Sequence, residues 1–316
     1  MHHPPILISV YTRLEHLKRC VDSLRMNPIS CGTDLYVVSD AASSGADEGK
    51  VESVRKYLNQ IEGFRGVIPV NREKNMGSFL SVKTALDGIF EKHERVVFME
   101  DDNVVSPNFL AFVEKGLEIY RDDPSIFSIS GYHYPIRIPK DYRCDIYKWQ
   151  GFSALGVGLW RHKWQALDWD YPGFSEVSKD RRKRKILDRY GEHLYGMILY
   201  NIKHRRNVID VAVSYNLYLK NMYSIFPVVS KVRNMGYDGS GEHVGVKRTY
   251  RNQPLDPGKD CQFIPEIQPD ERINQAMRRY FRMPVKTKMV STLAALIPED
   301  HKKWVKKQIY WDGTRR

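Results

Sequence analysis

The stretch VVFMEDD at residues 96–102 decides how the rest of the chain is interpreted. Four apolar residues run directly into three carboxylates, which is typical of a buried strand that ends at a charged tip. Three adjacent carboxylates repel one another unless a cation lies among their oxygens, so the pattern points to a bound divalent metal. A solvated acidic turn is the alternative, and the triplet alone does not separate the two.

Apolar runs and amphipathic segments alternate on both sides of this stretch. The runs predict strands at 6–10, 35–38, 67–70, 96–99 and 126–129. Helical spacing of apolar residues predicts helices at 14–24, 51–58, 79–90 and 107–120. Such alternation predicts right-handed βαβ units and a mainly parallel sheet, whose ligands bind at the carboxyl ends of the strands.

Polar residues follow the predicted strands and are therefore expected to meet at one edge of the sheet. They are Thr12, Arg13, Asp40, Asn75 and the triplet Glu100, Asp101 and Asp102. The regular alternation stops after Gly131. Beyond it we expect helices at 186–202 and 208–219, an extended segment at 223–232 and a glycine-rich loop at 234–243.

The composition favours a globular protein, with 42% hydrophobic residues in a chain of 316. No signal peptide is recognisable, no apolar run approaches the roughly 20 residues of a membrane span, and the four cysteines are widely spaced. These features predict a cytoplasmic protein. The net charge of +12 suits nucleic acid, anionic lipid or phosphorylated substrates, and part of it lies in the tail from Lys286 to Arg316.

Two common nucleotide-binding motifs are missing from the sequence. No GxGxxG follows the first strand, which argues against a dinucleotide fold, and no GxxxxGK[ST] is present, which removes P-loop chemistry. For a nucleotide-binding sheet with an acidic strand end, the remaining possibility is metal-assisted handling of a nucleotide diphosphate.

The ordered motifs resemble those of GT-A glycosyltransferases, especially family 2-like bacterial enzymes and the N-acetylglucosaminyltransferase I family. The resemblance runs through 5–17, Asp40, 72–77, 98–107, 128–132, 151–160 and 227–243. It implies an α/β fold of GT-A type, with a Rossmann-like, mainly parallel sheet flanked by helices. It also implies a single catalytic domain at 1–250, with a nucleotide-sugar-binding half at 1–131 and an acceptor-side half at 132–250. Residues 251–316 would form an irregular wrap and a basic helical tail.

The resemblance also assigns roles to single residues. Thr12, Arg13 and Asp40 would hold the base and ribose of a nucleotide sugar. Lys74 and Asn75 would shape the pocket, and Glu100 and Asp101 would contact sugar or ribose hydroxyls. Gly156 and Trp160 would cover the donor sugar, Gly156 by allowing close backbone approach and Trp160 by stacking. An ordinary buried turn with Trp160 in the core is the alternative.

The metal and the catalytic base are assigned by the same resemblance. Asp102 would ligate Mn²⁺ or Mg²⁺ together with His243, and an imidazole ligand favours Mn²⁺. Asp210 would be the base that accepts the proton of the acceptor hydroxyl. A helix N-terminal acid stabilised by the dipole explains Asp210 as well, and a surface histidine is the alternative for His243.

These observations predict a metal-dependent glycosyltransferase that moves a sugar from a nucleotide-diphosphate donor to a hydroxyl of a saccharide or lipid-linked acceptor. The resemblance implies that the reaction inverts the anomeric configuration. Its expected setting is the synthesis of surface polysaccharide or glycoconjugates. The basic tail suits an anionic membrane surface, such as the inner face of the plasma membrane, or docking onto the domain. No nucleic acid partner is expected. The alternatives are a sugar nucleotidyltransferase and a non-catalytic basic adaptor that binds nucleic acid or anionic lipid.

Overall fold

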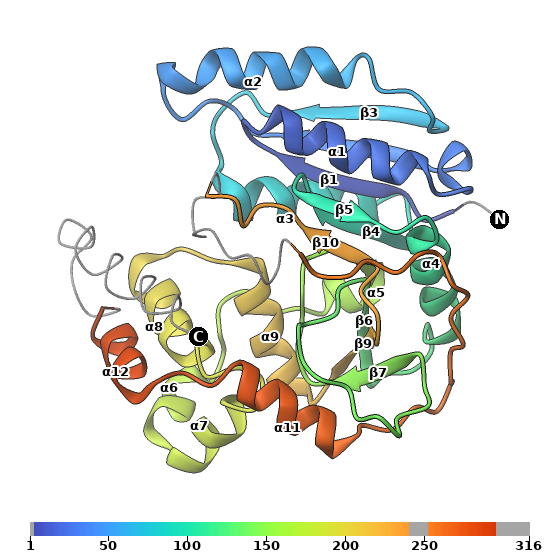
Figure 1. The fold of residues 1–316 in the computed structure, drawn as a ribbon. Helices are drawn as coiled ribbons and strands as arrows, with labels where there is room; N and C mark the ends of the chain where they lie inside the picture. The colour runs from blue at the N-terminus through green and yellow to red at the C-terminus, as the bar shows by residue number, and fades with distance from the viewer. Residues whose placement is uncertain (1–2, 240–251, 295–316) are drawn as a thin grey trace.

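A computed structural model describes residues 3–239 and 252–294 of the chain (Figure 1). Its centre is an eight-stranded sheet of order β3-β2-β1-β4-β8-β6-β9-β7, beside a two-stranded ribbon of β10 and β5. The strands are β1 Ile6–Val10, β2 Asp34–Ser39, β3 Gly66–Asn71, β4 Arg95–Glu100, β5 Asn103–Val105, β6 Ile126–Ser130, β7 Ile146–Trp149, β8 Val157–Trp160, β9 Tyr223–Pro227 and β10 Val232–Asn234. The predicted α/β fold class with a largely parallel sheet is confirmed.

The first half of the sheet follows the βαβ pattern expected from the sequence. Strands β3, β2, β1 and β4 are parallel neighbours. Their connections contain α1 (Leu14–Arg25), α2 (Gly45–Leu58) and α3 (Gly77–Phe90). Helix α2 begins six residues before the predicted position. Residues 45–50 are small or polar, so the apolar spacing that predicted the helix is first visible at Val51. Parallel pairing places the carboxyl ends of these strands at one edge.

Strand β8 was not predicted, and it changes the second half of the sheet. It lies between β4 and β6 and is antiparallel to both. The apolar residues of 157–160 are buried on both faces, so they show no alternation that would mark a strand. Strands β6 and β9 are parallel, and β7 is antiparallel to β9.

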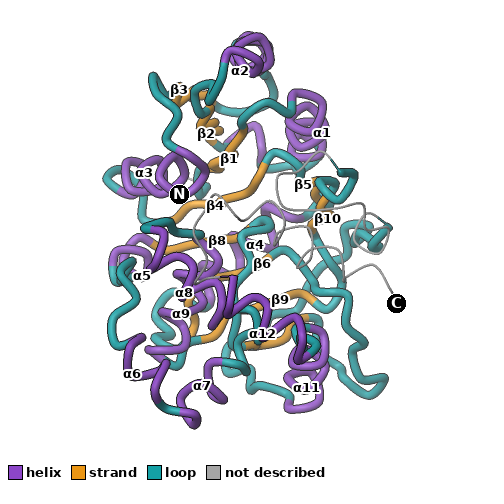
Figure 2. Tube along the Cα trace, turned by 90° about the vertical axis from the view of Figure 1, so that its left-hand side faces the viewer, coloured by secondary structure: helices purple, strands orange, loops and turns teal. Residues whose placement is uncertain are grey.

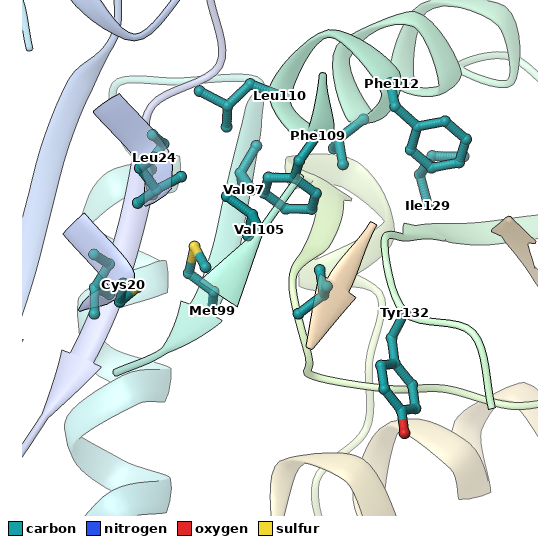
Figure 3. Packing of buried hydrophobic residues seen from close by; sticks show 14 of the residues in the cluster. Cys20, Leu24, Val97, Met99, Val105, Phe109, Leu110, Phe112, Ile129 and Tyr132 are labelled. Atoms are coloured by element: carbon teal, nitrogen blue, oxygen red, sulfur yellow. The ribbon is translucent and has the colours of Figure 1, made fainter. Parts of the chain in front are cut away.

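Helices cover both faces of the sheet, as Figure 2 shows. Alternate residues of the strands divide between the two layers: Val97 and Met99 pack with α1 and with α4 (Phe109–Ile119), whereas Val96 and Phe98 pack with α3 on the other face. Figure 3 shows the first of these cores, where Cys20 faces β4 and Phe109 lies beside Val97. The three-layer arrangement fixes the register that brings the strand ends together.

The remaining helices pack mainly on the α3 side or at the end of the sheet. They are α5 Arg161–Gln165, α6 Phe174–Lys179, α7 Arg181–Leu187, α8 Leu194–His204, α9 Ile209–Lys220, α11 Glu271–Tyr280 and α12 Val285–Ala294. The single helix predicted at 186–202 is wrong, since the chain breaks between α7 and α8 at Gly191, which has a φ of 147°. The helix predicted at 208–219 is α9. No helix in the described parts of the chain is long and apolar enough to cross a bilayer.

The segment from 252 to 281 lies along the domain. Phe263 packs against Phe112 of α4 with ring centroids 5.0 Å apart, and Asp256 forms a buried ion pair with Lys231 at 3.2 Å. Helix α11 covers the far end of the sheet, where Phe281 stacks on Trp149. The division of the chain at residues 131 and 250 stays a prediction.

One edge of the sheet ends at β3, whose centre is Pro69. This residue lies opposite Val37 of β2, is exposed, and has no N–H to donate.

Candidate active site

Four carboxylates gather at the carboxyl edge of the sheet, and we call them the carboxylate cluster: Glu100, Asp101, Asp102 and Asp210. The first three follow β4 directly, and Asp210 lies in the first turn of α9. The charges of Asp101, Asp102 and Asp210 all act on Glu100, so residues far apart in the sequence meet here. Asp101 and Asp102 are buried, whereas Asp210 is exposed.

Arg13 lies inside this cluster. Its guanidinium donates to both oxygens of Asp101 and lies 2.9 Å from Asp102 Oδ2. Burial lowers the pKa of Arg13, but the carboxylates of Asp101 and Asp102 raise it above its ordinary value, so Arg13 stays charged. Arg13 is therefore a counter-ion to the cluster, and its predicted contact with the base or ribose stays a prediction.

Asp102 is held on three sides by neighbouring groups. Its Oδ1 accepts a hydrogen bond from the Asn103 side chain at 2.8 Å, and its backbone oxygen accepts one from Met235 N at 2.8 Å. A Cβ on Gly236 would lie only 2.1 Å from Asp102 Oδ2. Gly236 thus lets the loop after β10 approach the carboxylate closely, a contact between distant residues that no local pattern predicts.

The two carboxylates on the open side of the cluster have raised pKa values. Burial raises the pKa of Glu100 well above its ordinary value, and the charges of Asp102 and Asp210 raise it further. Surrounding protein atoms raise the pKa of Asp210 to about 7, against an opposing effect of the Ala154 backbone. A carboxylate that reaches solvent and titrates near neutral pH suits a general base.

Asp40 has a structural role that the sequence did not indicate. Its carboxylate is 7% exposed and accepts hydrogen bonds from the backbone N–H groups of Ala41, Met76 and Gly77, at 2.8 to 3.2 Å. Asp40 therefore caps the N-terminus of α3 from a neighbouring strand. Both oxygens are engaged by the fold, and the predicted contact of Asp40 with the nucleotide stays a prediction.

Asp40→Ala is expected to lower the free energy of unfolding by about 1–3 kcal/mol, because it leaves buried N–H groups unsatisfied. Urea denaturation measures this loss. Asp40→Asn keeps one carbonyl acceptor and should lose less. An Asp40→Ala protein of unchanged stability that no longer binds nucleotide would instead support the nucleotide contact.

Three other predicted donor-site residues lie at the same edge. Thr12 is half-buried after β1, and Lys74 and Asn75 are exposed after β3. Asn75 donates to the backbone oxygen of Ala41 at 2.7 Å, which joins the loops that follow β2 and β3. Parallel pairing places these residues at the same edge of the sheet as the cluster, and their contacts with a donor stay predictions.

Gly156 and Trp160 belong to the core. Gly156 has a φ of 64°, and a Cβ there would lie 2.6 Å from Val232. Trp160 is 1% exposed and donates its indole N–H to the backbone oxygen of Leu117 at 3.0 Å, with Lys163 Nζ 3.9 Å from its ring centroid. The predicted stacking of Trp160 on the donor sugar is wrong, because the indole ring is buried in the core and a sugar cannot reach it.

His243 lies outside the described residues. The loop that precedes it contacts α1, since Asp238 Oδ2 lies 3.1 Å from His16 Nε2. The sequence analysis did not assign His16 to the site. Its position in the first turn after Arg13 was the available signal, because that helix begins at the carboxyl edge of the sheet.

The chemistry of the cluster fits a divalent cation, with Asp102 as the ligand. Its oxygens are hard ligands, and the cluster holds four carboxylates around the one guanidinium of Arg13. Among residues 3–239 and 252–294, no group of three His, Cys, Asp or Glu side chains is arranged to hold a metal. A metal at Asp102 would therefore need ligands beyond the side chains of these residues.

Two cavities lie away from the cluster. One of about 420 Å³ is lined by residues that include Asp123, His162 and Lys220, and another of about 430 Å³ by residues that include Gln150, Arg189 and Tyr218. Lys163, in the wall of the first, donates to the backbone oxygens of Tyr120, Asp123 and Ile126, which marks a structural lysine. The clustered titratable groups, rather than the cavities, identify the candidate site.

Comparison with solved structures gives only remote likenesses. No family model matches the chain. The mannosyltransferase PcManGT of Pyrobaculum calidifontis, solved with GDP-Man and Mn²⁺, is 16% identical with a TM-score of 0.35, over 51% of this chain and 45% of that one. TarS of S. aureus is 13% identical with a TM-score of 0.37, over 72% and 35%. These scores are too low to support an inference about this chain.

Comparison by sequence gives a more informative match. The chain is 23% identical over 184 residues to the alpha-1,3-mannosyl-glycoprotein 2-beta-N-acetylglucosaminyltransferase of Arabidopsis thaliana. The match covers 53% of this chain, and the chain spans 39% of that relative's length. The predicted resemblance to N-acetylglucosaminyltransferase I-like glycosyltransferases is thereby confirmed.

Proposed function

We propose that this chain is a metal-dependent glycosyltransferase that uses a nucleotide-diphosphate sugar. The observation that carries the proposal is the carboxylate cluster, in which buried acids at the carboxyl end of a parallel strand meet an exposed acid of raised pKa. Ligands of open α/β sheets bind at this edge. The match to an N-acetylglucosaminyltransferase supports the same reaction class.

The residues of the cluster would have separate roles in metal binding, donor binding and proton transfer. Asp102 would hold Mn²⁺ or Mg²⁺, with His243 as a further proposed ligand, and the bound ion would neutralise the leaving diphosphate. Arg13 keeps Asp101 and Asp102 in place by its ion pairs. Glu100 would face the donor. Its raised pKa favours the protonated carboxyl group, which can donate a hydrogen bond to a sugar or ribose hydroxyl.

Asp210 would accept the proton of the attacking hydroxyl. In a single displacement the acceptor oxygen forms a bond to the anomeric carbon while the bond to the diphosphate breaks, so the anomeric configuration inverts. The proton goes to the Asp210 carboxylate, whose surroundings raise its pKa to about 7. A saccharide or lipid-linked acceptor and a role in surface glycoconjugate synthesis belong to this proposal.

Nucleotide binding provides the first test. UDP, GDP or dTDP with Mn²⁺ should raise the Tm by several degrees, because a ligand at about 100 times its Kd adds about 2.7 kcal/mol to the free energy of unfolding. The rise should disappear with a chelator. A Tm unchanged by every nucleotide with metal would count against the proposal and favour the non-catalytic adaptor. A subsequent screen of nucleotide sugars for Mn²⁺-dependent hydrolysis or transfer identifies the donor.

The products distinguish the proposal from a sugar nucleotidyltransferase. A glycosyltransferase releases a nucleoside diphosphate from a nucleotide sugar. A nucleotidyltransferase instead makes a nucleotide sugar from a nucleoside triphosphate and a sugar phosphate and releases pyrophosphate. Mass spectrometry of the products of both incubations separates the two reactions.

A further inference from the structure

Three helices at the end of the molecule opposite α2 form a strongly basic surface. Helices α7, α8 and α12 lie together there, as Figure 1 shows, and we call their outer side the α7–α8–α12 surface. Residues 179–206 contain ten Lys and Arg but only three Asp and Glu. More than half of the net charge of +12 therefore lies in this short part of the chain.

An apolar stripe runs along the outer face of α12. Val285, Met289 and Leu293 are 76%, 61% and 56% exposed. They are spaced at i, i+4 and i+8, so they share one face of the helix. Leaving three such side chains in water is unfavourable, which indicates a partner for this face.

The opposite side of α12 is fixed to the domain. Lys288 Nζ lies 2.6 Å from Asp188 Oδ2 after α7, and Met283 N donates to Glu192 Oε2 at 2.9 Å before α8. These contacts hold the helix with its apolar stripe outward. Exposed apolar residues continue on the neighbouring elements at Ile202 and Val208.

Exposed cations lie on the two helices packed beside α12. Arg181, Arg182 and Lys185 are exposed on α7, and Arg205 is exposed at the end of α8. An exposed aliphatic stripe beside Lys and Arg is the combination that inserts into the headgroup region of an anionic bilayer. A nucleic acid would engage the cations but leave the aliphatic stripe in water.

We propose that the α7–α8–α12 surface docks on an anionic lipid bilayer. The docking is independent of the proposed reaction, but its placement matters for that reaction. Helix α8 packs on α9, whose first turn carries Asp210, and the exposed Val208 lies two residues before that acid. If the proposed function holds, a hydroxyl acceptor carried at a membrane surface would reach Asp210 without leaving the headgroup region.

Vesicle co-sedimentation of the full chain tests the docking. The protein should pellet with vesicles of phosphatidylcholine and phosphatidylglycerol and stay in solution with phosphatidylcholine alone. Val285→Ser/Met289→Ser/Leu293→Ser should weaken the partition about tenfold or more by removing the inserted apolar area. Arg181→Gln/Arg182→Gln/Lys185→Gln should weaken it about tenfold or more at low salt by removing the attraction to anionic headgroups.

A matched control changes similar residues at the other end of the molecule. Met26→Ser/Lys50→Gln/Lys56→Gln removes one apolar and two basic exposed side chains near and on α2, and should leave the partition unchanged. Each variant is checked by its Tm, and Met289→Ser alone carries the test if the triple variant does not fold. Vesicle binding that does not depend on lipid charge, or that is unchanged in both surface variants, overturns the proposal. Binding of an oligonucleotide without vesicle binding overturns it too and assigns the surface to nucleic acid.

Discussion

Asp102→Asn is expected to abolish the metal-dependent rise in Tm with nucleotide and to lower sugar transfer about a thousandfold or more, the loss of several kcal/mol of charge stabilisation. Asparagine keeps the shape of the side chain and its contact with Asn103, but it has no negative charge to hold a divalent cation. Differential scanning fluorimetry and a transfer assay measure the two effects.

The nucleotide-free protein should behave differently from the liganded one. The charge of Asp102 contributes to the raised pKa of Glu100, so its removal relieves repulsion in the carboxylate cluster. The substitution also removes the ion pair of Asp102 with Arg13, so the two effects oppose each other and the Tm without ligand should change little. Asp122→Asn, an exposed acid far from the cluster, serves as the control that changes neither quantity. Metal-dependent binding that persists in Asp102→Asn refutes the assignment of the ligand.

Asp210→Asn is expected to lower kcat about 10²–10⁴-fold while donor binding is kept, because it removes a general base without changing the metal site. The nucleotide-dependent rise in Tm should stay as in the unmodified protein. Single-turnover transfer at saturating donor separates this loss of chemistry from a loss of binding.

The alternative role of Asp210, stabilisation of the α9 N-terminus, has a different outcome. A charge in the first turn of a helix stabilises it by about 0.3–1 kcal/mol, so Asp210→Asn would lose only that much stability and keep its kcat. Glu48→Gln provides the matched control, since Glu48 is an exposed acid in the first turn of α2. Equal effects of the two substitutions would show that Asp210 is only a helix-stabilising acid.

The dependence of kcat on pH follows from the same assignment. The surroundings of Asp210 raise its pKa to about 7, and a base acts only when deprotonated. Activity should therefore increase as the pH rises through about 7, and this acidic limb should be missing from the residual activity of Asp210→Asn. A profile that is flat from pH 5 to 8 contradicts the role.

The sequence predicted those parts of the fold that depend on local periodicity. The strands β1, β2, β3, β4 and β6 and the helices between them follow from the spacing of apolar residues, and parallel pairing then places Arg13, Asp40 and Glu100 at one edge. The collection of acids after β4 is therefore predictable without coordinates.

The contacts that the sequence did not reveal join distant parts of the chain. Trp160 could not be placed because β8 is buried on both faces, and only its insertion between β4 and β6 shows that the indole packs inward. Arg13 pairs with Asp101, 88 positions away, and Asp40 caps a helix that begins 37 positions later. A motif shows that such residues lie near a site but not which neighbour they bind.

The proline at the end strand of the sheet has a consequence for how this protein behaves in a crowded solution. An outermost strand normally offers a continuous row of backbone donors and acceptors to any other extended chain. Pro69 interrupts that row at the middle of β3, because it carries no N–H and its ring obstructs close approach of another backbone. The edge is thereby protected against strand-to-strand aggregation at high protein concentration.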